Sequence, residues 1–178
     1  MIKPQRYDSP DSKGLESHDP DRAAERAMLQ PRLAGTNIDE NSFLATDYLN
    51  HYSEVAMLID MAASMPEVLD DAAEWRPKSY EAHFTESGFP HGDLAIEAFR
   101  IAPADIRRRF DAITARLDAI IPDIVARLIA VRDDPPALAA QQEAAHVELH
   151  SLMSALNGVV HAADNRSDQN GIDRLFEV

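Results

Sequence analysis

The sequence contains no cysteine among its 178 residues. Disulfide bridges, thiolate nucleophiles and thiolate metal ligands are therefore all excluded. Any metal ion that this chain binds must take its ligands from histidine, aspartate and glutamate. The absence of cysteine leaves the redox compartment open.

Basic residues are also few. The chain has 17 Lys and Arg against 31 Asp and Glu, a formal net charge of -14. A surface of this sign repels phosphate backbones, so nucleic acid is not an expected partner. No apolar run resembles a signal peptide or approaches the ~18 residues of a membrane span. We therefore expect a soluble, cytoplasmic protein with no membrane partner.

Glycine occurs only six times and forms no phosphate-binding loop, dinucleotide fingerprint or Gly-x-Ser-x-Gly elbow. Asp111 and Asp118 are seven residues apart, but carboxylates in such places are ordinarily solvated or paired with arginine. The sequence therefore nominates no catalytic residue, and we expect a protein that is not an enzyme. No alternating run bounded by glycine-containing turns predicts a strand, so the expected fold class is all-α.

Apolar residues recur at steps of four and three in three stretches, which places them on one face of a helix. These stretches predict long helices at 42–64, 104–133 and 136–164. The link between the last two is so short that they must be antiparallel neighbours. Pro122 is expected to kink or break the second helix. The three series are Leu44, Tyr48, Val55, Ile59 and Ala62; Phe110, Ile113, Leu117, Ile120, Ile124, Leu128 and Val131; and Leu138, Ala145, Leu149, Leu152, Leu156, Val159 and Ala163.

The expected architecture is an antiparallel helical bundle of about four main helices with a disordered N-terminal arm and a flexible C-terminal tail. The arm is rich in Pro, Ser and Asp, and we expect in it only a short helix that ends at Pro31. Asn41 or Ser42 is the expected N-cap of the first long helix. The expected regions are a largely disordered acidic and polar arm (1–40), the bundle (41–164), and a linker with a C-terminal docking peptide (165–178).

Glu143, His146 and His150 lie close together on the last predicted helix. At about 100° per residue they fall about 120°, 60° and 100° from Leu149, on a polar stripe beside the apolar seam. Such a stripe is ordinarily solvated. The same spacing also presents imidazole and carboxylate lone pairs to one point, as a metal site requires.

His51 lies in the apolar arc of the first predicted helix, with Asp47 and Glu54 beside it. A buried histidine needs a partner, and it can donate its ring proton to a carboxylate or a carbonyl. The alternative is a metal site in which Asp47, His51 and Glu54 face the histidines of the last helix.

Two resemblances bear on this alternative. Glu143 and His146 have the Glu-x-x-His spacing of di-iron carboxylate bundles, and His146, His150 and His51 resemble the three-histidine pattern of DinB-like metal bundles. The resemblances imply iron, manganese or zinc held by Asp47, His51, Glu54, Glu143, His146 and His150, with oxygen, peroxide or metal-storage chemistry.

The chain ends in Ile-Asp-Arg-Leu-Phe-Glu-Val after a polar linker. Ile172, Leu175 and Phe176 have the i, i+3, i+4 spacing of a peptide that folds as one helical turn in a partner's groove. The same residues can instead pack onto their own bundle.

Residues 168–176 resemble a short element of chemotaxis phosphatases and flagellar switch proteins that binds the chemotaxis response regulator. The resemblance implies a protein partner contacted by Ile172, Asp173, Leu175 and Phe176. The last long helix lacks the Asp and Gln, one turn apart, that the phosphatase uses, so phosphatase activity is not expected.

The sequence therefore favours a non-enzymatic adaptor or regulatory protein that needs no cofactor and binds a signalling partner through its C-terminal motif. A metal-binding bundle is the alternative. The long apolar seams also leave a homodimer open, since a helical hairpin needs more apolar cover than it supplies itself.

Overall fold

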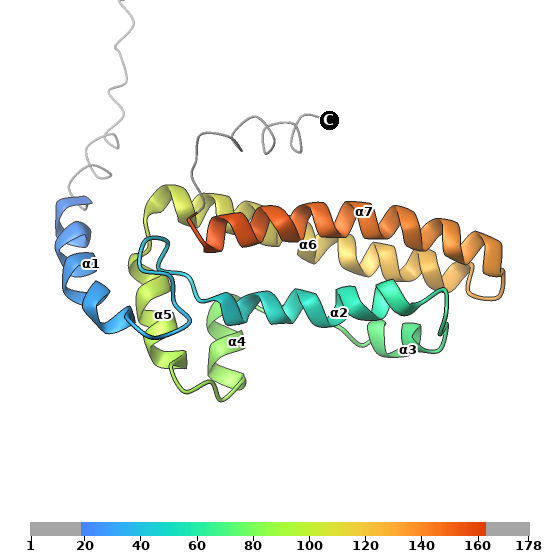
Figure 1. The fold of residues 1–178 in the computed structure, drawn as a ribbon, viewed down its shortest axis with the longest axis horizontal. Helices are drawn as coiled ribbons and strands as arrows, with labels where there is room; N and C mark the ends of the chain where they lie inside the picture. The colour runs from blue at the N-terminus through green and yellow to red at the C-terminus, as the bar shows by residue number, and fades with distance from the viewer. Residues whose placement is uncertain (1–18, 163–178) are drawn as a thin grey trace, which may run out of the picture.

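A computed structural model describes residues 19–162, and this part of the chain is mostly helical (Figure 1). It contains seven α-helices, one 3-10 helix and no strand, which confirms the all-α prediction for the described residues. None of the described helices is both long enough and apolar enough to cross a bilayer. The elements are α1 (Asp19–Leu33), η1 (Thr46–Leu49), α2 (Asn50–Met61), α3 (Val68–Ala72), α4 (Tyr80–Glu86), α5 (Gly92–Ile101), α6 (Ala104–Ala130) and α7 (Pro135–Val160).

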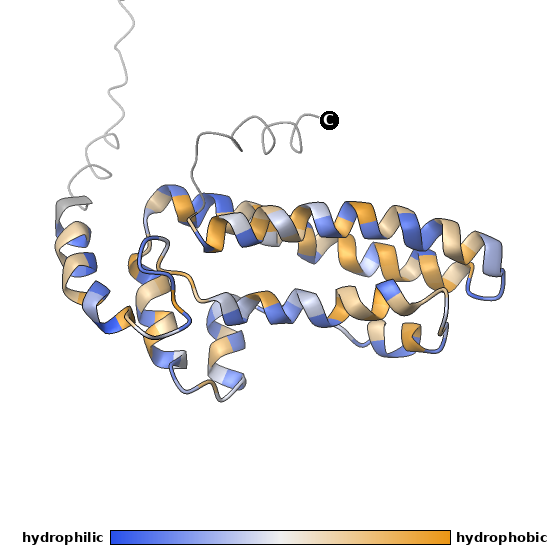
Figure 2. Ribbon diagram, in the orientation of Figure 1, coloured by the Kyte–Doolittle hydropathy of each residue, from blue (hydrophilic) through white to orange (hydrophobic). Residues whose placement is uncertain are grey.

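The longest elements, α6 and α7, form the predicted antiparallel hairpin (Figure 1). Asp134 caps α7 by accepting a hydrogen bond from the Ala137 backbone N–H at 3.2 Å. Polar and apolar residues alternate around both helices (Figure 2), and the predicted seam of α7 is buried as far as Val159. The hairpin therefore follows from local pattern and capping.

The seam of α6 differs from the predicted one at Ile120 and at Val131, which follows the end of the helix and is only partly buried. Ile121 is fully buried, whereas Ile120, the predicted seam residue, is only partly buried. On a straight helix a strict seven-residue repeat drifts by about 20° per heptad around the axis. By the third heptad this drift turns Ile120 away from the core and brings Ile121 into it. Pro122 does not break the helix, which continues to Ala130.

α2 is shorter than predicted, and neither Asn41 nor Ser42 caps it. The 3-10 helix η1 leads directly into α2. The Ser42 hydroxyl instead donates a hydrogen bond to the Val160 carbonyl at 2.5 Å. The side chain thus satisfies a carbonyl that the end of α7 leaves without an intrahelical partner.

The expected arm of residues 1–40 is not disordered over its described part. α1 packs on α5, buries Leu29 and Leu33, and continues two residues past Pro31. Burying two leucines contributes roughly 3–6 kcal/mol, which offsets the roughly 3 kcal/mol that an internal proline costs. An ion pair of 3.0 Å between Arg32 and Glu97 also joins the two helices. The sequence predicts a short helix here, but not its continuation to Leu33 or its packing on α5, because only two of its apolar residues form the buried face.

α2, α6 and α7 run lengthwise side by side; α4 and α5 lie across their direction at one end, and α1 lies beyond α5 (Figure 1). At that crossing a group of aromatic rings fills the core. The rings belong to Tyr48, Tyr80, Phe84, Phe99 and Phe110.

Candidate functional site

Two histidines of α7 and one aspartate of α2 meet between these helices. Asp60 Oδ1 lies 2.8 Å from His146 Nδ1, and Asp60 Oδ2 lies 2.9 Å from His150 Nε2. One ligand atom from each residue lies within 4.8 Å of the others. Among residues 19–162 no other set of three or more His, Asp and Glu side chains meets this condition.

The backbone positions this site from both sides. His146 and His150 are one turn apart on α7 and therefore point the same way, with ring centroids 4.2 Å apart. Gln142, one turn earlier, donates to the Asp60 carbonyl at 2.5 Å and accepts from the Ala63 N–H at 2.7 Å. It thereby satisfies backbone groups at the end of α2 and holds Asp60 against α7.

The charges of the site depend on one another. Burial opposes ionisation of Asp60, but hydrogen bonds from His146 and His150 outweigh it and lower the pKa of the carboxyl. The hydrogen bond to Asp60 raises the pKa of His146. The proton on His146 therefore stabilises the fold at low pH, and this contribution is lost as pH rises through the raised pKa.

The site is accessible from solvent. The side chains of His146, His150 and Asp60 are 47%, 42% and 32% exposed. Two imidazoles and one carboxylate are a donor set that suits Zn²⁺ or Fe²⁺, with bonds of about 2.0–2.2 Å. Because three protein ligands do not complete either ion's coordination, a bound ion would keep positions for water or another ligand.

The structure brings together only part of the predicted ligand set. His146 and His150 belong to the site, and Glu143 lies close enough to contribute to the raised pKa of His146. His51 does not reach the site, because it is nine residues before Asp60, about 180° around α2. Asp47, in η1, and Glu54, in α2, are also outside the group.

His51 instead enters an aromatic environment. It is buried and stacks on Trp75, with ring centroids 5.0 Å apart, while the Trp75 indole donates to the His51 carbonyl at 3.1 Å. Its Nε2 is buried and has no hydrogen-bond partner in the described structure. Burial, with smaller contributions from His83 and Lys78, lowers the pKa of His51 to about 4. His51 is therefore neutral at physiological pH.

Asp60 is the member of the site that the sequence did not predict. It lies at the end of α2 with no other His, Asp or Glu within five residues of it, and its partners are 86 and 90 residues away. A single carboxylate near a helix end carries no local signal for such a role. The predicted partner-binding residues Ile172, Asp173, Leu175 and Phe176 lie outside the described residues.

No protein-family model, curated protein sequence or solved structure matches this chain.

Proposed function

We propose that this chain is a metal-binding helical protein whose Asp60, His146 and His150 hold one divalent late first-row ion, of which zinc is the leading candidate. The observation that carries the proposal is the meeting of two imidazole nitrogens with the two oxygens of one carboxylate. These atoms are 2.8 and 2.9 Å apart, while ligand atoms on a tetrahedral zinc ion lie about 3.3 Å apart, so small side-chain shifts would admit the ion.

The proposed role of the ion is to fasten α2 to the α6–α7 hairpin. Asp60 belongs to α2 and both histidines to α7, so metal binding links two elements that are distant in sequence. The geometry favours one ion over a di-iron centre, because only one three-ligand group occurs among residues 19–162. A di-iron carboxylate site takes a glutamate from each of two helices and a Glu-x-x-His pair from each of two others.

Zinc is expected to bind the wild type at one ion per chain and to raise its melting temperature. At a free zinc concentration of 100 times Kd the free energy of unfolding rises by about 2.7 kcal/mol, or about 5–10 °C in Tm. His150→Ala should weaken binding by about 100-fold, because one of three protein ligands is lost. Calorimetric titration of chelator-treated, tag-free protein, followed by thermal melts, measures both effects.

His161→Ala is the matched control, since His161 is also exposed on the last described turn but lies outside the site. It should bind zinc like the wild type. Wild-type affinity should also rise from pH 6 to pH 8, because the metal competes with the proton on His146. Equal zinc binding by the wild type and His150→Ala, or no saturable binding by the wild type, would overturn the proposal.

We propose, as a second and separate function, that the C-terminal motif binds a signalling protein, with a chemotaxis response regulator as the candidate partner. Sequence carries this proposal: a polar linker followed by Ile172, Leu175 and Phe176 at helical spacing. On this proposal the protein acts as an adaptor or regulator, and the metal site stabilises the part that carries the motif.

Deleting residues 171–178 is expected to abolish binding to the response regulator and to leave Tm unchanged. Purified response regulator, with and without beryllium fluoride to mimic phosphorylation, can be titrated against both proteins. The triple variant Ile172→Ala, Leu175→Ala, Phe176→Ala should behave like the deletion, since it removes the apolar anchors and keeps the chain length. A deletion that lowers Tm by several degrees would show that the motif packs on its own bundle instead.

A further inference from the structure

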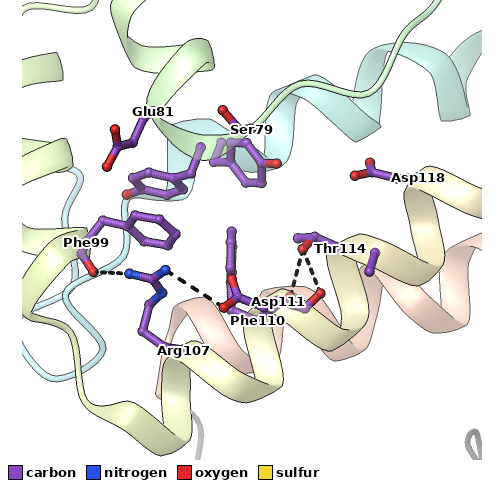
Figure 3. Close-up of a pocket in the computed structure, with 11 residues that line it drawn as sticks. Ser79, Glu81, Phe99, Arg107, Phe110, Asp111, Thr114 and Asp118 are labelled. Carbon is purple, nitrogen blue, oxygen red and sulfur yellow. Dashed lines mark hydrogen bonds and ion pairs between the residues drawn. The ribbon is translucent and has the colours of Figure 1, made fainter.

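The carboxylates around the surface cavity between α4, α5 and α6 are satisfied within the chain (Figure 3). This cavity has a volume of about 410 Å³, and three carboxylates line it. Their partners are Arg100 for Glu81, Arg107 for Asp111 and the Tyr52 hydroxyl for Asp118. The Asp60 site differs, because three ligands leave the coordination of a bound ion incomplete at a solvent-exposed surface.

Two exposed apolar side chains flank the Asp60 site, one on each of its helices. Met57 on α2 is 57% exposed and lies three residues, about 60° around the helix, from Asp60. Val147 on α7 is 63% exposed and directly follows one of the two histidines. Only two other large apolar side chains among residues 19–162 are exposed, those of Met28 and Met65. Contact with another molecule at the Asp60 site would therefore remove apolar surface from water.

The outer face of α7 beside the site has little charge. Between residues 139 and 154 its exposed side chains include a single carboxylate, that of Glu143, and the others belong to alanines, serines, His146 and Val147. A second copy of this chain, with a formal net charge of -14, is repelled least where carboxylates are sparse. Small alanine and serine side chains also let another helix approach closely.

Glu143 is close to the site but does not belong to it within its own chain. The residue is exposed and lies one turn before His146 on α7. Its charge contributes to the raised pKa of His146. Its carboxylate is nevertheless not in the group of ligand atoms that lie within 4.8 Å of one another. Glu143 is therefore available as a ligand to an ion held by another molecule.

A two-fold axis through this face brings Glu143 of each copy to the site of the other. When two α7 helices cross antiparallel about an axis between residues 145 and 146, residue 143 of one copy faces residue 148 of the other, between the two histidines of the site. About the same axis, Val147 of each copy faces the exposed Ala144 of the other. An apolar contact therefore lies beside each added ligand, and every contact occurs twice.

We propose that zinc joins two copies of this chain into a symmetric dimer, in which Glu143 of each copy supplies the fourth ligand to the ion in the other copy's Asp60 site. This inference rests on the zinc site proposed above. Four protein ligands complete the tetrahedral coordination that zinc takes in structural sites. The two ions also offset the like charge of the two copies, so the metal-free chain remains a monomer.

Sedimentation velocity of chelator-treated, tag-free, full-length protein, without zinc and with one equivalent of zinc, tests this dimer. We expect a monomer without zinc, a dimer with zinc, and a return to the monomer when a chelator is added. Calorimetric titration of the same protein counts the zinc ions bound per chain. One zinc ion per chain on a protein that stays monomeric would overturn the dimer and leave the zinc site standing, whereas no zinc binding would overturn both.

Three variants locate the contact, and thermal melts check that each is folded. Glu143→Gln removes the charge of the fourth ligand and should raise the Kd of the dimer at least about tenfold. Val147→Asp puts a carboxylate into the contact and should keep the chain monomeric in zinc. Met28→Asp is the matched control, since Met28 is 71% exposed but lies on α1, and it should form the dimer like the wild type. A wild-type Kd in Glu143→Gln, or equal effects of Val147→Asp and Met28→Asp, would overturn the proposal.

Discussion

Replacing Phe110 by alanine is expected to lower the free energy of unfolding by about 3–5 kcal/mol. Phe110 is 2% exposed, and its ring lies 5.4 Å from Tyr48, 5.7 Å from Tyr80 and 5.4 Å from Phe99 between centroids. The substitution removes a whole ring from the point where α4, α5 and α6 meet. Because the neighbouring rings belong to different elements, they cannot close together to fill the cavity, and its full cost remains.

Urea unfolding followed by far-ultraviolet circular dichroism measures this loss. Phe89→Ala is the matched control, since Phe89 is only partly buried at the edge of the same aromatic group. It should cost clearly less, because the ring already contacts water. Equal losses in the two variants would show that Phe110 is not central to the core.

Acidification from pH 7 to pH 4 is expected to remove about 3 kcal/mol of stability through His51 alone. The pKa of His51 is lowered to about 4 by burial, aided by His83 and Lys78, from 6.5 in the unfolded chain. Between these values the unfolded state binds more protons than the folded state. The free energy of unfolding therefore falls as pH decreases from 6.5 towards 4. The fold has its full stability, as far as His51 is concerned, only above this range.

His51→Phe removes this titration and keeps a ring that can stack on Trp75. Between pH 7 and pH 4 the free energy of unfolding of the wild type should fall by about 3 kcal/mol more than that of His51→Phe, because only the wild type is protonated at this position. Carboxylate titrations are common to both proteins and cancel in the difference. Parallel profiles would contradict the assignment. Trp75 is the only tryptophan, so its fluorescence reports directly on the His51 environment.

The two histidine environments therefore act on stability in opposite directions. His51 is buried among rings, and its protonation destabilises the fold. His146 is held by a carboxylate on the surface, and its protonation stabilises the fold. Two histidines thus have opposite effects on stability because their neighbours differ. The spacing of residues along one helix does not reveal these neighbours.

Local physics was enough to predict much of the helical framework. The steps of four and three placed Leu117 and Leu149 in buried seams, and the short Asp-Asp-Pro-Pro link predicted an antiparallel hairpin, both of which the described structure contains. These features depend on residues within a few turns of one another. The same reasoning misplaced Ile120 and did not predict that α1 continues past Pro31 and packs on α5, because small drifts in helix phase and the cover supplied by α5 are set by packing between elements.

The sequence by itself determined what chemistry was available: no thiolate, few cations, and metal ligands limited to imidazole and carboxylate. Tertiary structure alone decided which of these groups meet. The docking of α2 on α7 joined Asp60 to His146 and His150, and turned His51 away toward Trp75. The physical reason is that the helical repeat determines which residues share one face of a helix. Which other helix covers that face depends on how the apolar seams of all the helices are buried together.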